Sequence, residues 1–219
     1  MKVPMITKNR NKLHFVKILR RNYPETFRAS LQEIEQAFQL IDNDIQFGAT
    51  SKNPMDKRLG FAGWFLALIQ VLERQGKSFD EIRRVCLEVA IEYVRPKHKL
   101  HSWFKKLPVK LIGTKLGQKI IKIFQQKISQ KGHMDGFVAN VITDKHETFE
   151  LGYGIDILEC GICKLFKKHN ADQYVLILCE VDKITSELAG LELIRTGTLS
   201  AGAEKCDFRF RKITSSNLS

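Results

Sequence analysis

Apolar residues recur every three or four positions through the first part of the chain, and this spacing predicts helices with one buried face. One such stripe covers residues 27–45. Residues 54–75 are apolar nearly all round at the centre, which predicts a buried central helix. Ser78 and Glu81 form a capping box that begins a helix ending near Tyr93. This part of the chain is therefore expected to form a helical layer.

A further helix is expected over residues 109–129, with lysines and apolar residues on separate faces. The lysines that share one face are Lys115, Lys119 and Lys122. The apolar residues that turn the other way are Leu116, Ile120, Ile123 and Phe124. The pattern favours a solvated lysine face on this helix.

The pattern changes near Gly132 from the helical period to alternation. Residues 137–142 are typical of a strand. Apolar residues alternate with polar residues or glycines from Phe149 to Ile157, which predicts a second strand with one buried face. Two helices are expected next, over residues 159–168 and 172–188. The last two strands are expected over residues 191–198 and 205–211.

This order of elements, ββααββ, predicts a four-stranded antiparallel sheet with helices on one face. We expect an α+β protein in which an N-terminal helical layer packs on this C-terminal sheet. The expected divisions are a basic N-terminal arm over 1–21, a helical region over 22–131, an α+β region with the cysteine motifs over 132–213, and a disordered tail over 214–219.

Composition places the protein among ordinary globular chains, with 43% hydrophobic and 27% charged residues. The longest apolar run, residues 59–72, is shorter than the about 20 residues that cross a bilayer. No apolar stretch with a cleavage site follows the basic N-terminus. The five cysteines are too few and odd in number for a secreted disulfide framework. We therefore expect a cytoplasmic protein with reduced thiols.

Positive charge is concentrated between Arg95 and Lys131, where eleven lysines and arginines occur without any acid. This segment accounts for nearly all of the net charge of +12. A solvated surface is the simplest interpretation, and attachment of residues 95–131 to an anionic membrane surface is the alternative. Nucleic-acid binding is disfavoured because no nucleic-acid-binding motif accompanies the charge.

The cysteines after residue 159 are the main candidates for chemistry. Cys160 and Cys163 stand at the start of an expected helix, where the spacing places both thiols on one side and the helix dipole favours a thiolate. Cys179 and Asp182 show the same spacing on the next helix, and Cys206 lies on the last strand. Three interpretations remain open: buried hydrophobes, a nucleophilic site, and a metal or cluster site. For Cys86, in an apolar stripe, core packing is expected.

No cofactor is expected on the nucleophilic interpretation. The alternative is zinc or an iron–sulfur cluster held by Cys160, Cys163, Cys179 and Cys206. Arg195 and Arg209 are candidates for binding a carboxylate, because guanidinium groups bind carboxylates through two hydrogen bonds. Asp182 and Asp207 are candidates for proton transfer. Strand alternation turns Asp207 away from Cys206, which makes Asp207 the weakest member of this group.

These residues resemble the L-2-amino-thiazoline-4-carboxylic acid hydrolase family. The similarity rests on the segment 154–166 around Cys160, on the pair Cys179 and Asp182, and on an Arg-Thr…Gly…Cys-Asp-Phe-Arg pattern. The members of that pattern are Arg195, Thr196, Gly202, Cys206, Asp207, Phe208 and Arg209. Residues 135–211 carry the resemblance closely, and Cys163 departs from it.

The resemblance implies hydrolysis of a cyclic amidine-like thiazoline that bears a carboxylate, giving an N-carbamoyl amino acid, in an enzyme class that acts on a non-peptide C–N bond. It implies catalytic roles for Cys160, Cys179, Asp182 and Cys206. Arg195, Arg209 and Thr196 are then expected to bind a small carboxylate-bearing substrate. The layout also resembles the sensing domain related to 4-vinyl reductase, so a non-enzymatic small-molecule or metal sensor is the alternative. The sequence does not indicate the oligomeric state.

Overall fold

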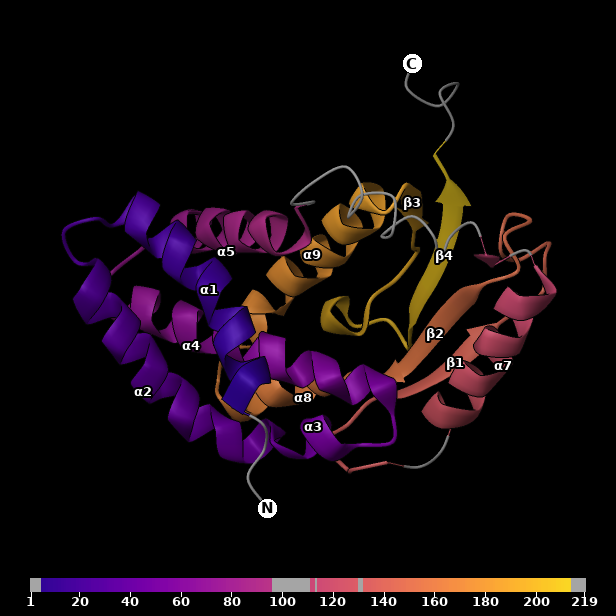
Figure 1. The fold of residues 1–219 in the computed structure, drawn as a ribbon, viewed down its shortest axis with the longest axis horizontal. Helices are drawn as coiled ribbons and strands as arrows, with labels where there is room; N and C mark the ends of the chain where they lie inside the picture. Colours follow the sequence, from indigo (N-terminus) through magenta and orange to yellow (C-terminus); the bar gives the residue numbers. More distant parts are fainter. Residues whose placement is uncertain (1–4, 96–110, 113, 130–131, 214–219) are drawn as a thin grey trace.

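The computed structural model describes the backbone of residues 5–95, 111–112, 114–129 and 132–213, with side chains from residue 12 onward. Helices occupy the N-terminal part and an antiparallel sheet the C-terminal part, which confirms the predicted α+β class (Figure 1). The tail expected over 214–219 and most of the basic stretch before residue 111 lie outside the described residues. None of the helices in the described ranges has the length and apolar character needed to cross a membrane.

The N-terminal part contains helices α1 (Met5–Asn22), α2 (Phe27–Ile45), α3 (Phe47–Thr50), α4 (Leu59–Arg74) and α5 (Phe79–Val94), with the 3-10 helix η1 (Pro54–Arg58) before α4. Ser78 caps α5 by accepting a hydrogen bond from the backbone N–H of Glu81, as the capping box predicts. Helix α4 is the predicted buried helix, with residues 64–69 no more than 4% exposed. The basic segment 1–21 contributes Phe15, Ile18 and Leu19 to the core, so α1 packs against the other helices.

The sheet consists of β1 (Val138–Ile142), β2 (Gly154–Glu159), β3 (Leu191–Ile194) and β4 (Cys206–Lys212) in the order β1-β2-β4-β3. Helix α8 (Gly161–Lys168), the 3-10 helix η2 (Asp172–Tyr174) and helix α9 (Val175–Leu188) connect β2 to β3, giving the predicted ββααββ order. The 3-10 helix η3 (Leu199–Ala201) connects β3 to β4 and packs on α9 (Figure 1). Every neighbouring pair of strands is antiparallel.

The strand expected from Phe149 to Ile157 is shorter than its alternating pattern predicted. Residues 145–152 form turns, and the strand begins at Gly154. Phe149, Glu150 and Gly152 have φ angles of 49°, 62° and 69°, in the left-handed region that no strand residue adopts. The buried Thr148 hydroxyl fixes this turn, because it donates to the Asp144 carbonyl and accepts from the Gly152 N–H.

Helix α7 (Lys115–Ile128) also differs from its predicted orientation. Its buried residues are Gly117, Ile121 and Ile128, with Phe124 half-buried. The apolar residues that were expected to turn away from the lysines are largely exposed: Leu116 at 58%, Ile120 at 53% and Ile123 at 53%. The helix therefore presents an apolar stripe to solvent beside its lysines.

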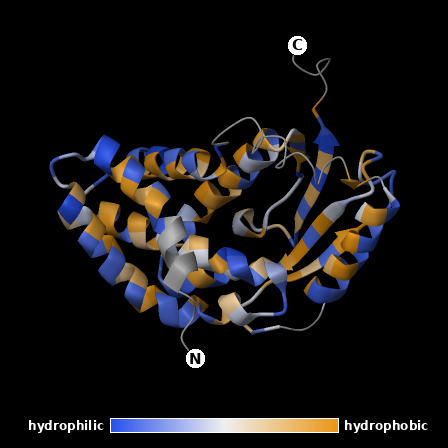
Figure 2. Ribbon diagram, viewed as in Figure 1, coloured by the Kyte–Doolittle hydropathy of each residue, from blue (hydrophilic) through white to orange (hydrophobic). Residues whose placement is uncertain are grey.

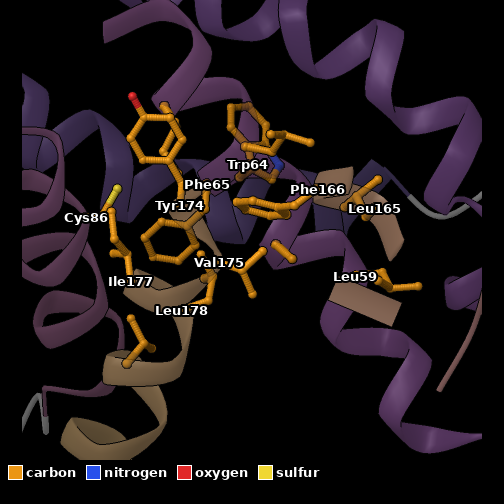
Figure 3. Packing of buried hydrophobic residues seen from close by; sticks show 14 of the residues in the cluster. Leu59, Trp64, Phe65, Cys86, Leu165, Phe166, Tyr174, Val175, Ile177 and Leu178 are labelled. Carbon is orange, nitrogen blue, oxygen red and sulfur yellow. The ribbon is translucent and has the colours of Figure 1, made fainter. Parts of the chain in front are cut away.

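One continuous core joins the helices to the sheet. Figure 3 shows its centre, where Trp64 and Phe65 of α4 meet Phe166 of α8 and Val175 of α9. Figure 2 shows hydrophobic and hydrophilic positions alternating along the helices and along β4. A buried polar contact adds to the packing: Asp56 of η1 accepts a hydrogen bond of 2.9 Å from the Phe137 N–H, and Ser51 donates to the same carboxylate. This contact holds the start of α4 beside β1.

Candidate active site

Cys160 occupies the N-cap position of α8 directly after β2, and Cys163 lies one turn further on. Both residues are half-buried. The pKa of Cys160 is lowered to about 7, chiefly because the Cys163 thiol donates a hydrogen bond to its thiolate, and the backbone N–H groups of Cys163 and Ile162 add to the effect. The pKa of Cys163 is raised strongly by the same hydrogen bond and by burial. Cys160 is therefore the more acidic thiol of the pair.

Cys179 projects from α9 toward the loop that carries η3. Its sulfur lies 3.3 Å from the Ser200 hydroxyl oxygen. Burial raises the pKa of the Cys179 thiol above its ordinary value. Cys206, at the start of β4, accepts a hydrogen bond of 3.2 Å from the Leu199 N–H. Burial raises its pKa to about 11. These two thiols are therefore mostly protonated near neutral pH.

The four cysteines lie close enough for their charges to interact. The charges of Cys160, Cys179 and Cys206 all raise the pKa of Cys163, and Asp182 raises that of Cys160. Cys160 and Cys163 share the start of α8, while Cys179 and Cys206 contact adjacent residues of the η3 loop, Ser200 and Leu199. Cys86 lies apart from them in the helical core, fully buried, as expected for a packing residue.

Asp182 of α9 lies between two arginines. Its carboxylate is 3.6 Å from the Arg58 guanidinium and 3.9 Å from that of Arg195. Burial raises the pKa of Asp182 above 3.8, although both arginines oppose this shift. A carboxyl group with a raised pKa is protonated more often than an ordinary carboxyl group at the same pH, which favours a role in proton transfer.

Arg195 itself is largely buried at the end of the β3 segment. Its Nη2 donates a hydrogen bond of 3.4 Å to the Cys179 carbonyl, and its guanidinium lies 5.1 Å from the centre of the Phe208 ring. Its Nη1 is buried without a hydrogen-bond partner. A buried guanidinium nitrogen without a partner is costly, so this nitrogen is a position where a ligand oxygen would be stabilising.

A cavity of about 280 Å³ opens beside Asp182, between the sheet and the helices. Its polar lining comes from Asp182, Thr185 and Ser186 of α9 and from Arg58 of η1. Its apolar lining consists of Pro54, Met55, Phe124, Tyr153, Ile155, Ile157, Phe208 and Phe210. Asp182 is therefore shared between the wall of the cavity and the neighbourhood of the cysteines.

The sequence pattern that defines the L-2-amino-thiazoline-4-carboxylic acid hydrolase family matches residues 57–210. The chain belongs to this family. No curated protein and no solved structure matches the chain. The matched range of the hydrolase family begins before Arg58 and ends within β4, so it includes all the cysteines, Asp182 and both arginines around it.

Two residues of the hydrolase family pattern, Thr196 and Asp207, bind each other. The Asp207 carboxylate accepts hydrogen bonds from the Thr196 N–H at 3.0 Å, the Thr196 hydroxyl at 2.6 Å and the Gly197 N–H at 2.9 Å. These bonds lower the pKa of Asp207 although its burial opposes them. Both residues therefore hold the turn after β3, and the Thr196 hydroxyl is already occupied.

Arg209 lies on the opposite face of the sheet from Cys206 and Phe208, because alternate residues of β4 point to opposite faces. Its guanidinium binds Asp156 at 2.8 Å, and Lys205 binds the same carboxylate at 2.5 Å. The structure thus groups Arg195 with the cysteines and places Arg209 in a separate cluster.

Arg58, Ser200 and Tyr153 are neighbours of the site that sequence reasoning missed. Arg58 precedes a long apolar helix, and no spacing rule links it to a site one hundred residues away in the sequence. Within the described residues, no group of three or more histidine, cysteine, aspartate or glutamate side chains is arranged to hold a metal ion. The geometry therefore adds no support to the zinc or iron–sulfur alternative.

Proposed function

We propose that this member of the hydrolase family opens the ring of a cyclic amidine-like thiazoline that bears a carboxylate, as in L-2-amino-thiazoline-4-carboxylate. The observation that carries the proposal is the position of Asp182. This partly buried carboxyl group lies at the wall of the cavity, between Arg58 and Arg195, and close enough to Cys160 to change the pKa of its thiol. A nucleophile, an acid and a cation are the groups that the reaction requires.

In the proposed first step, the Cys160 thiolate attacks the ring carbon between sulfur and nitrogen. The ring carbon–sulfur bond breaks, its electron pair goes to the sulfur, and protonated Asp182 supplies the proton that makes the leaving thiol. Cys160 is then bonded to the former ring carbon. A pKa of about 7 leaves a large part of the Cys160 thiol ionised at neutral pH, which favours it over Cys179 and Cys206 as the nucleophile.

In the second step, water adds to the same carbon while the Asp182 carboxylate takes its proton, and the Cys160 thiolate leaves. The product is the N-carbamoyl amino acid, and the enzyme returns to its starting state. Atom balance requires the carbon–sulfur bond to break for this product, in place of the C–N bond that the expected enzyme class names. Cleavage of the ring C–N bond would leave the carbamoyl group on sulfur instead, so the identity of the product distinguishes the two routes.

The substrate carboxylate is assigned to the arginines beside Asp182. Arg58 faces the cavity, and Nη1 of Arg195, 3.9 Å from the Asp182 carboxylate, has no hydrogen-bond partner. The Arg58→Ala variant is expected to raise KM by roughly ten- to a hundredfold with a smaller change in kcat, because a lost charged hydrogen bond costs about 1.5–3 kcal/mol. Arg209→Ala, on the other face of the sheet, is the matched control.

Incubation of the purified chain with L-2-amino-thiazoline-4-carboxylate, followed by mass spectrometry, tests the proposal. Turnover that is lost in Cys160→Ser and retained in Cys179→Ser is the expected result. Turnover that survives in Cys160→Ser would remove the proposed nucleophile. Saturable ligand binding without any product would favour the sensor function over hydrolysis. The cytoplasmic location and the absence of a cofactor stay predictions.

A further inference from the structure

We propose that Cys160 and Cys163 form a redox-active dithiol, which closes to a disulfide by exchange with a low-molecular-weight disulfide such as glutathione disulfide. In the proposed hydrolysis Cys163 only lowers the pKa of Cys160 and forms no bond to the substrate. The two residues stand one turn apart at the start of α8, on the same side of the helix, and both are half-buried rather than enclosed. Their placement brings two sulfurs together at an accessible position.

The first half of the exchange falls to Cys160. Its thiolate attacks one sulfur of the small disulfide, whose other half leaves as a thiolate, and a mixed disulfide forms on Cys160. A thiol with a pKa near the ambient pH is the most effective attacking group, because it combines ionisation with nucleophilicity. The pKa of about 7 at Cys160 meets this condition.

The second half falls to Cys163. Its pKa is held high chiefly by its hydrogen bond to the Cys160 thiolate, with burial and the Cys160 charge adding to the effect. Forming the mixed disulfide removes the negative charge from Cys160, so this part of the barrier to Cys163 ionisation disappears. Cys163 then loses its proton, attacks the Cys160 sulfur and releases the second small thiol. In sum, two protein thiols are oxidised and one small disulfide is reduced to two thiols.

The other cysteines are poorer partners for Cys160. Cys179 contacts the Ser200 hydroxyl, and Cys206 accepts the Leu199 N–H. Burial raises the pKa of both thiols, and the charge of the Cys160 thiolate raises them further. Cys86 is fully buried among the helices. The exchange is therefore expected to stop at one specific pair.

Closing this disulfide removes the thiolate on which the proposed hydrolysis depends. That consequence rests on the proposed function, whereas the disulfide itself does not. Oxidation would block turnover, and dithiothreitol would restore it. A chain that forms the disulfide but never hydrolyses the thiazoline would therefore support the dithiol and reject the hydrolase, and the reverse outcome would do the opposite.

The test uses the full chain in buffers with a graded ratio of reduced to oxidised glutathione. Free thiols are blocked with N-ethylmaleimide, and the unreduced protein is digested with trypsin. Cys160 and Cys163 lie on one tryptic peptide, His146–Lys164, so their disulfide appears as the loss of two hydrogens from an unlabelled peptide. The expected result is this peptide, together with labelled Cys86, Cys179 and Cys206.

Two variants separate the roles. In Cys163→Ser, Cys160 is expected to remain as a stable mixed disulfide with glutathione, because the resolving thiol is missing. In Cys179→Ser, the matched control, the disulfide is expected to form as in the unchanged chain. Circular dichroism establishes that each variant is folded. A disulfide from Cys160 to Cys179 or Cys206, a mixed disulfide that persists in the unchanged chain, or full labelling of all five cysteines under oxidising buffer would overturn the proposal.

Discussion

At the scale of single residues, the effect of Cys163 on the pKa of the Cys160 thiol can be measured. The rate of Cys160 alkylation by iodoacetamide is expected to rise with pH and to level off above a midpoint of about 7, because only the thiolate reacts. Replacing Cys163 with alanine removes the thiol that donates to this thiolate, so the midpoint is expected to move upward. Mass spectrometry of the alkylated peptide provides the measurement.

Cys206 is the internal control for this titration, because burial raises its pKa to about 11 and its alkylation should still be slow at neutral pH. A Cys160 profile that stays unchanged in the Cys163→Ala variant would show that the hydrogen bond does not control the pKa of Cys160.

The residue scale also shows what the sequence reveals about the site. Helical spacing placed Cys160 beside Cys163, and strand alternation separated Asp207 and Arg209 from Cys206. The periodicity of a helix or strand is sufficient to predict which residues of that element lie on the same face. It carries no information about Arg58, because the contact of this arginine with Asp182 depends on how the helical layer docks on α9.

At the scale of elements, Asp207 controls the loop between β3 and β4. In Asp207→Ala, the N–H groups of Thr196 and Gly197 lose the carboxylate that accepts their hydrogen bonds. We expect the free energy of unfolding to fall by about 1–3 kcal/mol, the usual cost of such a loss. Urea denaturation measures this change. Because Thr196 directly follows Arg195, which is assigned to the substrate carboxylate, turnover is expected to fall as well.

Asp207→Asn is the graded comparison, because an amide oxygen still accepts from the backbone. It is expected to lose less stability than Asp207→Ala. Equal losses in both variants would mean that the carboxylate does not hold the turn through these hydrogen bonds.

A second prediction at this scale concerns the contact between α2 and α8. Asp44 of α2 binds Lys168 at 2.6 Å and His169 at 2.9 Å, and these hydrogen bonds, that from Lys168 first, lower the pKa of Asp44. The folded chain therefore favours the ionised carboxylate. Its stabilisation is complete above the ordinary pKa of 3.8 and is lost as the pH falls through the lower folded value.

Asp44→Asn is accordingly expected to lower the free energy of unfolding at neutral pH by about 1 kcal/mol or less, because Lys168 is half-exposed. The difference from the unchanged chain should shrink as the pH falls below 3.8. Glu25→Gln, at an exposed position, serves as the control in the same urea titrations. A difference that persists unchanged into acid would rule out ionisation of Asp44 as its cause.

Elements also show where periodicity misleads. The alternation from Phe149 to Ile157 is real in sequence, yet only Gly154 onward enters the sheet. The Thr148 hydroxyl and the residues with left-handed φ angles after it form a turn. The alternation of hydrophobic and polar residues does not reveal this turn. The strands and helices that the sequence did predict are those in which apolar residues recur at the period of the element along its whole length.

At the scale of the whole molecule, the helical and sheet parts depend on a shared core. Phe166 of α8 is fully buried beside Trp64 and Phe65 of α4 (Figure 3). Arg83 of α5 binds Glu180 of α9 through two hydrogen bonds, of 2.9 and 2.5 Å. The order of predicted elements was sufficient to predict the fold class. It did not predict how the helices pack on the sheet, because the period of an element does not indicate which distant element it contacts. The cavity exists only where the two parts meet.

The outer face of α7 bears on the alternative interpretation of the basic segment, its attachment to an anionic membrane surface. Leu116, Ile120 and Ile123 are more than half exposed, and Lys115, Lys119, Lys122 and Lys127 lie exposed on the same helix, which contains no acid. An apolar stripe beside lysines is the pattern of a helix that lies in the surface of an anionic bilayer. Residues 96–110, with further lysines, lie outside the described residues.

The full chain is therefore expected to pellet with vesicles of phosphatidylglycerol, and not with vesicles of phosphatidylcholine alone, at low salt. Ile120→Glu places a charge in the apolar stripe and should abolish most of this binding. Gln126→Glu, which adds the same charge on the exposed side of the helix outside the stripe, should weaken it less. Binding should also fall as salt screens the lysines. Equal binding by both variants would show that charge alone attracts the chain, and an absence of binding at low salt would leave α7 as an ordinary solvated surface.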